Sequence, residues 1–270
     1  MGKDSMQNWK VTLAYDGTGF HGWQIQPGLR TIQAELQGAL KRMCGEDPLP
    51  QGSGRTDAGV HALGQVASFG LEAPIPAENL RRALNRTLPA AIRLTDVERV
   101  SGGFHARHSA VAKTYEYRIF RGQLCSPFLA PYVHGCTWKL DMEELRRAAA
   151  DVVGEHDFVS LAASDPEVSA RGEGEFTSEW QNRSTVRRIF SSDWREEAGD
   201  LLVYRVRGNG FLHHMVRNLV GTMLEIARGQ FPAGSMAAIL AARARSAAGP
   251  TAPAKGLFLH SVEYEPQGLL

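Results

Sequence analysis

The chain has 270 residues, of which 43% are hydrophobic and 22% charged, and its formal net charge is +1. These values are ordinary for a globular protein, and the length allows one large or two medium domains. The small net charge neither indicates nor excludes a nucleic-acid partner, because a local basic face can coexist with an acidic one.

No apolar run approaches the ~20 residues of a membrane span, and the first residues hold no apolar stretch typical of a secretory signal. The cysteines, Cys44, Cys125 and Cys136, are odd in number and show no Cys-x-x-Cys spacing. This pattern favours a reducing compartment. We therefore expect a cytoplasmic protein with no membrane partner.

The first half of the chain predicts the element order β-α-β-β-α-β. Residues 9–15 alternate as a strand, and Thr31 begins a helix with apolar residues at helical spacing. Strand-like runs flank a glycine-rich loop and end near Phe69. A second helix starts at Pro76, and residues 92–97 close the half as a strand. This order is the split ferredoxin-like arrangement.

The second half fits the same order. Asp141 is the predicted cap of a helix that Gly154 ends. A long apolar helix is predicted over 211–227, and the strands are predicted at 113–120, 185–194, 201–206 and 257–264. We therefore predict an α+β protein of two ferredoxin-like halves, 1–108 and 109–270, although the duplication rests on element order alone.

Residues 164–184 interrupt the second half with proline, glycine, serine and charged side chains. Such a composition is typical of a surface loop, and a loop of this length inside a domain is often functional or disordered. We expect a peripheral excursion from the domain.

Residues 52–61, Gly-Ser-Gly-Arg-Thr-Asp-Ala-Gly-Val-His, pack glycines, Arg55 and Asp57 between two apolar runs. A carboxylate held in such a turn is a candidate reactive group, and a turn merely capped by Asp57 is the alternative. A phosphate-binding Walker loop is excluded because no lysine follows Gly59. A dinucleotide fingerprint is disfavoured because Asp57 occupies the third glycine position and a strand follows instead of a helix.

Arg217 lies among apolar residues in the predicted helix 211–227. Such an arginine either reaches toward water or pairs with a buried carboxylate. Spacing by four places His213, Arg217 and Gly221 on one stripe. Gly221 favours a functional role for the arginine, since a glycine one turn away allows close backbone approach.

Aromatic and histidine side chains offer weaker signals. Tyr115 and Tyr117 share one face of a strand, as core residues or as a platform on which each stacked base contributes ~1–3 kcal/mol. Residues 20–24 predict a loop with exposed aromatic side chains, or a turn packed by Trp23. The nine histidines form no recognised ligand spacing, so we expect no metal.

Three segments carry the most specific signal: residues 15–24 (Tyr-Asp-Gly-Thr-Gly-Phe-His-Gly-Trp-Gln), 54–61 (Gly-Arg-Thr-Asp-Ala-Gly-Val-His) and 215–221 (Met-Val-Arg-Asn-Leu-Val-Gly). Together they closely resemble the tRNA pseudouridine synthase A family. Residues 104–107, 113–117 and 255–259 also match in order and spacing, so the resemblance spans nearly the whole chain.

The resemblance implies the pseudouridine synthase fold, with sheets flanked by helices and a cleft between the two halves. It implies isomerisation of uridine to pseudouridine at positions 38, 39 and 40 of the tRNA anticodon stem-loop, with no cofactor, nucleotide or metal. It also implies a homodimer, so that one tRNA touches both subunits. Residues 164–184 look longer than the family's usual form, and their acidic side chains predict a place away from the RNA.

By the same resemblance, Asp57 is the essential catalytic carboxylate, and Arg217 pairs with it and keeps it ionised. Tyr115 stacks on the target uracil, and Arg55 enters the stem-loop where the uridine flips out. The other substrate-binding residues that the resemblance implies are Trp23, Gln24, His61 and Arg107.

Two alternatives stay open at this point. A non-catalytic RNA-binding protein of two ferredoxin-like halves would use the same aromatic and arginine side chains, but it would have no use for Asp57. A pseudouridine synthase with a shifted choice of RNA would keep the chemistry and change the modified positions.

Overall fold

The computed structural model describes residues 6–163 and 184–265. Nearly all of the predicted excursion at 164–184 therefore lies outside the described residues. The chain divides into two compact units, unit 1 (Met1–Tyr115 with Ala254–Leu270) and unit 2 (Glu116–Pro253). Unit 1 therefore contains residues 109–115 and 254–270, which the predicted halves 1–108 and 109–270 place in the second half. The last strand belongs to unit 1 because it pairs with a strand of that unit.

Unit 1 has the elements β1 (Gln7–Tyr15), α1 (Ile32–Cys44), β2 (Gln51–Gly52), β3 (His61–Leu71), α2 (Ala77–Thr87), β4 (Ile92–Val100) and β10 (Leu257–Tyr264). The first six follow the predicted order β-α-β-β-α-β. Strand β1 lies between β4 and β3 and is antiparallel to both, whereas β10 joins β3 in parallel. β2 pairs with β3 and leads into the glycine-rich loop.

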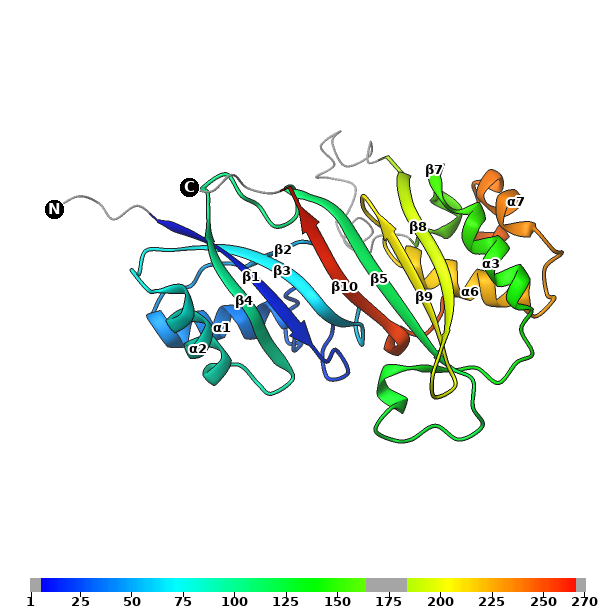
Figure 1. Cartoon of the computed structure of the whole chain (residues 1–270). Helices are drawn as coiled ribbons and strands as arrows, with labels where there is room; N and C mark the ends of the chain where they lie inside the picture. Colours follow the sequence, from blue (N-terminus) through cyan, green and yellow to red (C-terminus); the bar gives the residue numbers. More distant parts are fainter. Residues whose placement is uncertain (1–5, 164–183, 266–270) are drawn as a thin grey trace. The chain divides into compact units, whose positions relative to one another are not determined.

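The core of unit 1 lies between one face of this sheet and helices α1 and α2, which lie next to each other in Figure 1. Burial alternates along β1, with Trp9, Val11 and Leu13 fully buried. Helix α1 begins where predicted, because the Thr31 hydroxyl accepts a hydrogen bond from the Ala34 backbone N–H (3.4 Å) and so satisfies one free donor of the first turn.

β5 (Ala110–Phe120) begins in unit 1 and ends in unit 2. Unit 2 continues with β6 (His134–Gly135), α3 (Met142–Asp151), β7 (Gly154–Asp157), β8 (Val186–Glu197), β9 (Leu201–Gly208), α6 (Met215–Ala227) and α7 (Ser235–Ala242). β8 and β9 form the predicted hairpin, and Asp141 caps α3 by accepting from the Glu143 and Glu144 backbone N–H groups. β7, which pairs with β8, and α7 are additions to the predicted order.

Helix α6 begins at Met215, four residues later than predicted. His214 has a φ of 57°, in the left-handed region, so the backbone cannot extend the helix toward Phe211. The predicted stripe of His213, Arg217 and Gly221 is therefore wrong for His213, which precedes the helix. Arg217 is half-buried, and every other residue of α6 is buried.

Residues 249–252 pack against α6 at Gly221, as the sequence suggested for this glycine. A Cβ at Gly221 would overlap the Pro250 carbonyl oxygen. The Ala252 N–H donates to the Arg217 carbonyl oxygen (3.1 Å), and the Gly249 N–H donates to Thr222 Oγ1 (3.0 Å). Gly221 thus allows a loop backbone to lie directly on the helix.

Within the described residues, no helix combines the length and apolar character needed to cross a membrane.

Replacing Gly221 with alanine should destabilise unit 2 by about 1–3 kcal/mol, because the added methyl group forces the Pro250 backbone outward. Urea unfolding of the whole chain measures this change. Gly135→Ala is the matched control, since its Cβ would meet no atom within 4 Å. Equal stabilities for the two variants would contradict the packing described here.

Buried tyrosines should make the fold sensitive to alkaline pH. Burial raises the pKa of Tyr15 to about 12 and also raises those of Tyr117 and Tyr204. A raised folded-state pKa adds stability that is fully present below the unfolded pKa of about 10 and is lost as pH rises through the folded values. The free energy of unfolding measured in urea should therefore fall from about pH 9 to about pH 12. Phenolate absorbance near 295 nm should rise as the protein unfolds. Full phenolate absorbance from a protein that stays folded would contradict this expectation.

Candidate active site

The loop of residues 53–60 connects β2 with β3 in unit 1 and carries Arg55 and Asp57. Backbone hydrogen bonds fix it to the turn after β1. The Trp23 N–H donates to the Thr56 carbonyl oxygen (3.0 Å), and the Gly59 N–H donates to the Phe20 carbonyl oxygen (3.3 Å). A further bond within the loop, from the Val60 N–H to the Asp57 carbonyl oxygen (3.1 Å), closes a turn around Asp57.

Gly22 makes this close approach possible. It has a φ of 84°, and a Cβ there would lie 2.5 Å from the Thr56 carbonyl oxygen. Any other residue would be strained in that backbone conformation and would also push the loop away. The position of the loop therefore depends on a glycine at residue 22 in the turn.

Arg55 and Asp57 differ in their exposure. Asp57 is half-buried, whereas Arg55 is exposed. An exposed, permanently charged arginine can reach a partner in solution. A half-buried carboxylate held by a fixed backbone has the restricted geometry that a reactive group needs.

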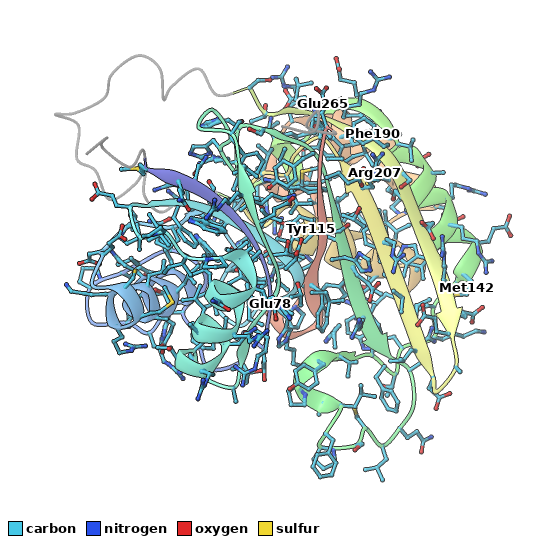
Figure 2. All side chains as sticks on the ribbon, turned by 60° about the vertical axis from the view of Figure 1, so that its left-hand side comes forward. Glu78, Tyr115, Met142, Phe190, Arg207 and Glu265 are labelled. Atoms are coloured by element: carbon cyan, nitrogen blue, oxygen red, sulfur yellow. The ribbon has the colours of Figure 1, made fainter. Side chains whose placement is uncertain are left out.

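Tyr115, which Figure 2 labels, is on β5 and lies within electrostatic reach of Asp57. Its side chain is 8% exposed. Burial raises the pKa of Tyr115 well above its ordinary value, and electrostatic repulsion from Tyr15, once that phenol is itself ionised, and from Asp57 raises the pKa further. Tyr115 is therefore a neutral phenol at physiological pH, and its ring adds no charge beside the Asp57 carboxylate.

Two of the other predicted site residues of unit 1 are buried. Trp23 is 2% exposed, and a Cβ at Gly52 would lie 2.5 Å from its Cε2 atom. The expectation of exposed aromatic side chains in residues 20–24 is thus wrong, because the turn is packed by Trp23 and Phe20. His61 is 1% exposed, accepts a hydrogen bond from the Gly17 N–H at Nδ1 (3.0 Å) and stacks on Phe258.

Gln24 and Arg107 lie nearer the surface. Gln24 is half-buried, and Arg107 is exposed in the turn that precedes β5. The Arg107 N–H donates to Nδ1 of His105 (3.1 Å), so the backbone at this arginine is held in place. Both side chains can meet a partner without a change in the fold.

Arg217 lies in unit 2, on α6. Its Nε donates to the Ala252 carbonyl oxygen (2.7 Å), so the loop that packs on Gly221 also orients this arginine. The guanidinium therefore has a defined direction set by residues 249–252. The structure describes the two units separately, and the predicted pairing of Arg217 with Asp57 stays a prediction.

Unit 2 also carries two arginines around the buried carboxylate of Glu116. Glu116 accepts from Arg118 Nε (2.8 Å) and from Arg205 (2.6 Å). Burial alone would raise the pKa of Glu116, but the hydrogen bonds from Arg205 and Arg118 outweigh it and hold the pKa below its usual value. Figure 2 shows Arg207 near Phe190, and its guanidinium lies 4.8 Å from the centre of that ring. Arg118 lies on β5 and Arg205 and Arg207 on β9, so three arginines lie on two neighbouring strands of the sheet.

The sequence did not single out three residues that contact the Asp57 loop: Tyr15, Gln65 and Lys113. Lys113 Nζ donates to the Ser53 carbonyl oxygen (2.5 Å), at the start of the loop. Gln65 is buried within β3. The sequence did offer one signal for Gln65: a glutamine in the predicted strand that ends near Phe69. If such an amide is buried, it requires hydrogen-bond partners.

Comparison with known proteins identifies the family. The family model described as tRNA pseudouridine synthase matches residues 12–109 and 148–265. A tRNA pseudouridine synthase A of Solibacter usitatus is 52% identical over 96% of this chain and 100% of its own length. The Bacillus pumilus and Moorella thermoacetica proteins of that name are each 43% identical, over 95% and 94% of this chain and 98% of their own lengths.

A solved structure of a Cbf5-Nop10-Gar1 complex aligns with 80% of this chain and 53% of that chain, at 11% identity. Its TM-score of 0.31 is too low to bear on the fold. The family model and the full-length relatives suffice, and the chain belongs to the tRNA pseudouridine synthase A family.

Proposed function

We propose that this protein isomerises uridine to pseudouridine at positions 38, 39 and 40 of the tRNA anticodon stem-loop. The observation that carries the proposal is the Asp57 loop. It holds a half-buried carboxylate in a turn fixed by three backbone hydrogen bonds, in a chain that is 52% identical to a full-length tRNA pseudouridine synthase A. A protein that only binds RNA has no need of such a carboxylate.

The reaction breaks the bond between N1 of uracil and C1′ of the ribose and forms a bond between C5 and C1′. The proton on C5 is lost, and N1 gains a proton. A single ionised carboxylate can act either by attacking C1′ or by promoting departure of the uracil. Asp57 acts differently in the two routes, but both require its carboxylate beside C1′.

The remaining roles surround this carboxylate. In the proposal, Arg217 pairs with Asp57 and keeps it ionised, since an opposite charge lowers the pKa of a carboxyl group. Tyr115 stacks on the target uracil as a neutral ring, after the side chains that cover it move aside. Arg55, exposed at the loop, enters the stem-loop at the place vacated by the flipped uridine.

Arginines at the surface would bind the tRNA backbone. The exposed Arg107 and the half-buried Arg207 supply positive charge for phosphate contacts, and Gln24 can contact the substrate from the turn after β1. The burial of Trp23 and His61 supports indirect roles for them, in holding the loop and the turn. We further propose that the protein acts as a homodimer in the cytoplasm.

Asp57→Asn should abolish tritium release from tRNA transcripts labelled at C5 of uridine, lowering turnover by roughly a thousandfold or more. Binding of tRNA should persist, because the amide keeps the shape of the carboxylate. Asp96→Asn, an exposed carboxylate on β4, should release tritium at the wild-type rate. If the wild-type protein binds tRNA but releases no tritium, the protein is an RNA-binding protein and the proposed activity fails.

Arg55→Ala should lower kcat/KM by about 10–100-fold, since the side chain compensates a base-flipping step that costs a few kcal/mol. A mismatch at the target uridine should restore part of the loss, because an unpaired base is flipped at lower cost. Arg86→Ala, which removes an exposed arginine of α2, should leave both substrates unaffected. The same loss on paired and mismatched substrates would remove base flipping as the role of Arg55.

A further inference from the structure

We propose that Gln65, together with Tyr15, is a positioning residue that holds the loop carrying Asp57. The inference rests on the proposed function, since it concerns the same carboxylate. Gln65 is 0% exposed and Tyr15 is 4% exposed. Both side chains form hydrogen bonds to residues of the loop, so we expect their effect on the reaction to pass through the loop.

The Gln65 amide joins the first two residues of the loop to β3. The Ser53 hydroxyl donates to Gln65 Oε1 (2.7 Å), and the Val66 N–H donates to the same oxygen (3.1 Å). Gln65 Nε2 donates to the Gly54 carbonyl oxygen (3.0 Å). A flipped amide would set donor against donor and acceptor against acceptor, so these partners allow only one orientation.

Tyr15 extends the same network to the residue before Asp57. Its hydroxyl group shares a hydrogen bond with Thr56 Oγ1 (2.8 Å), and Gln65 Nε2 lies 3.5 Å from that hydroxyl, at the long limit for a hydrogen bond. Thr56 is 6% exposed. Buried polar side chains thus hold three of the four residues that precede Asp57, namely Ser53, Gly54 and Thr56.

This arrangement serves geometry more than affinity. A buried amide with all its partners present specifies a backbone conformation, whereas removal of its donor leaves the Gly54 carbonyl oxygen unsatisfied and lets the loop relax. A displacement of about 1 Å at a reacting group can lower a rate about 100-fold. Loss of the Gln65 amide donor should therefore lower kcat while the KM for tRNA stays the same.

The test replaces the amide with a carboxylic acid at two positions of unit 1. In Gln65→Glu, the ionised side chain presents an oxygen instead of a donor to the Gly54 carbonyl oxygen. Asn85→Asp is the matched control. The Asn85 amide donates to the Leu94 carbonyl oxygen (2.9 Å) and accepts from the Leu94 N–H (2.8 Å), and both bonds lie away from the Asp57 loop.

Steady-state tritium release at about pH 8 should give a kcat about 10–100-fold below wild type for Gln65→Glu, with KM within about threefold. Asn85→Asp should lower thermal stability but keep the wild-type kcat at a temperature where both variants are folded. Lowering the pH to about 6 should recover part of the Gln65→Glu loss relative to wild type, because burial raises a carboxyl pKa and the protonated acid regains a donor.

Three results would overturn the proposal: an unchanged kcat in folded Gln65→Glu, an equal kcat loss in Asn85→Asp, or a raised KM with kcat unchanged. If Gln65→Glu does not fold, Tyr15→Phe decides by the same criteria, because it removes only the hydroxyl that holds Thr56. The wild-type protein and Asp57→Asn are measured in the same experiment as controls for the proposed function. Inactivity of the wild type refutes the proposed function, whereas active wild type, inactive Asp57→Asn and fully active Gln65→Glu refute only the positioning role.

Discussion

The hydrogen bond between the Trp23 N–H and the Thr56 carbonyl oxygen joins the two segments on which the site of unit 1 depends. One is the turn after β1, and the other is the loop that carries Asp57. The bond exists because Gly22 lets the turn backbone approach the loop at a positive φ. Loops usually lie on the surface and move more than the elements they connect. Here the loop is tied on one side by backbone bonds and on the other by buried side chains.

The regular elements of unit 1 follow from local patterns in the sequence. Alternating apolar residues placed β1, and the Thr31 hydroxyl marked the start of α1, because both signals act within a few residues. The α+β class followed from the element order. The resemblance to the family came from residues 15–24, 54–61 and 215–221 taken together, with 54–61 the most specific of the three.

The remaining features depend on contacts that local patterns do not report. The start of α6 depends on a left-handed His214, whose conformation is set by surrounding structure rather than by helix propensity. The sequence left open whether Trp23 is exposed or packs the turn, and its contact with Gly52, a residue distant in sequence, decides for packing. Gln65 stood in a correctly predicted strand, but its importance became visible only when its partners Ser53 and Gly54 were located.

The buried polar groups that contact the Asp57 loop contribute little to the stability of the fold. Burying a hydroxyl or an amide gains little net stability even when every hydrogen bond is made, and apolar side chains of similar volume would contribute more. Such groups do specify one arrangement, because each donor accepts only one geometry of its partner. If the chemistry relies on the Asp57 carboxylate alone, as proposed, no second carboxylate compensates for a misplaced loop. The buried network of Ser53, Gln65, Tyr15 and Thr56 is therefore best explained by the need to fix the position of Asp57 rather than by the stability of unit 1.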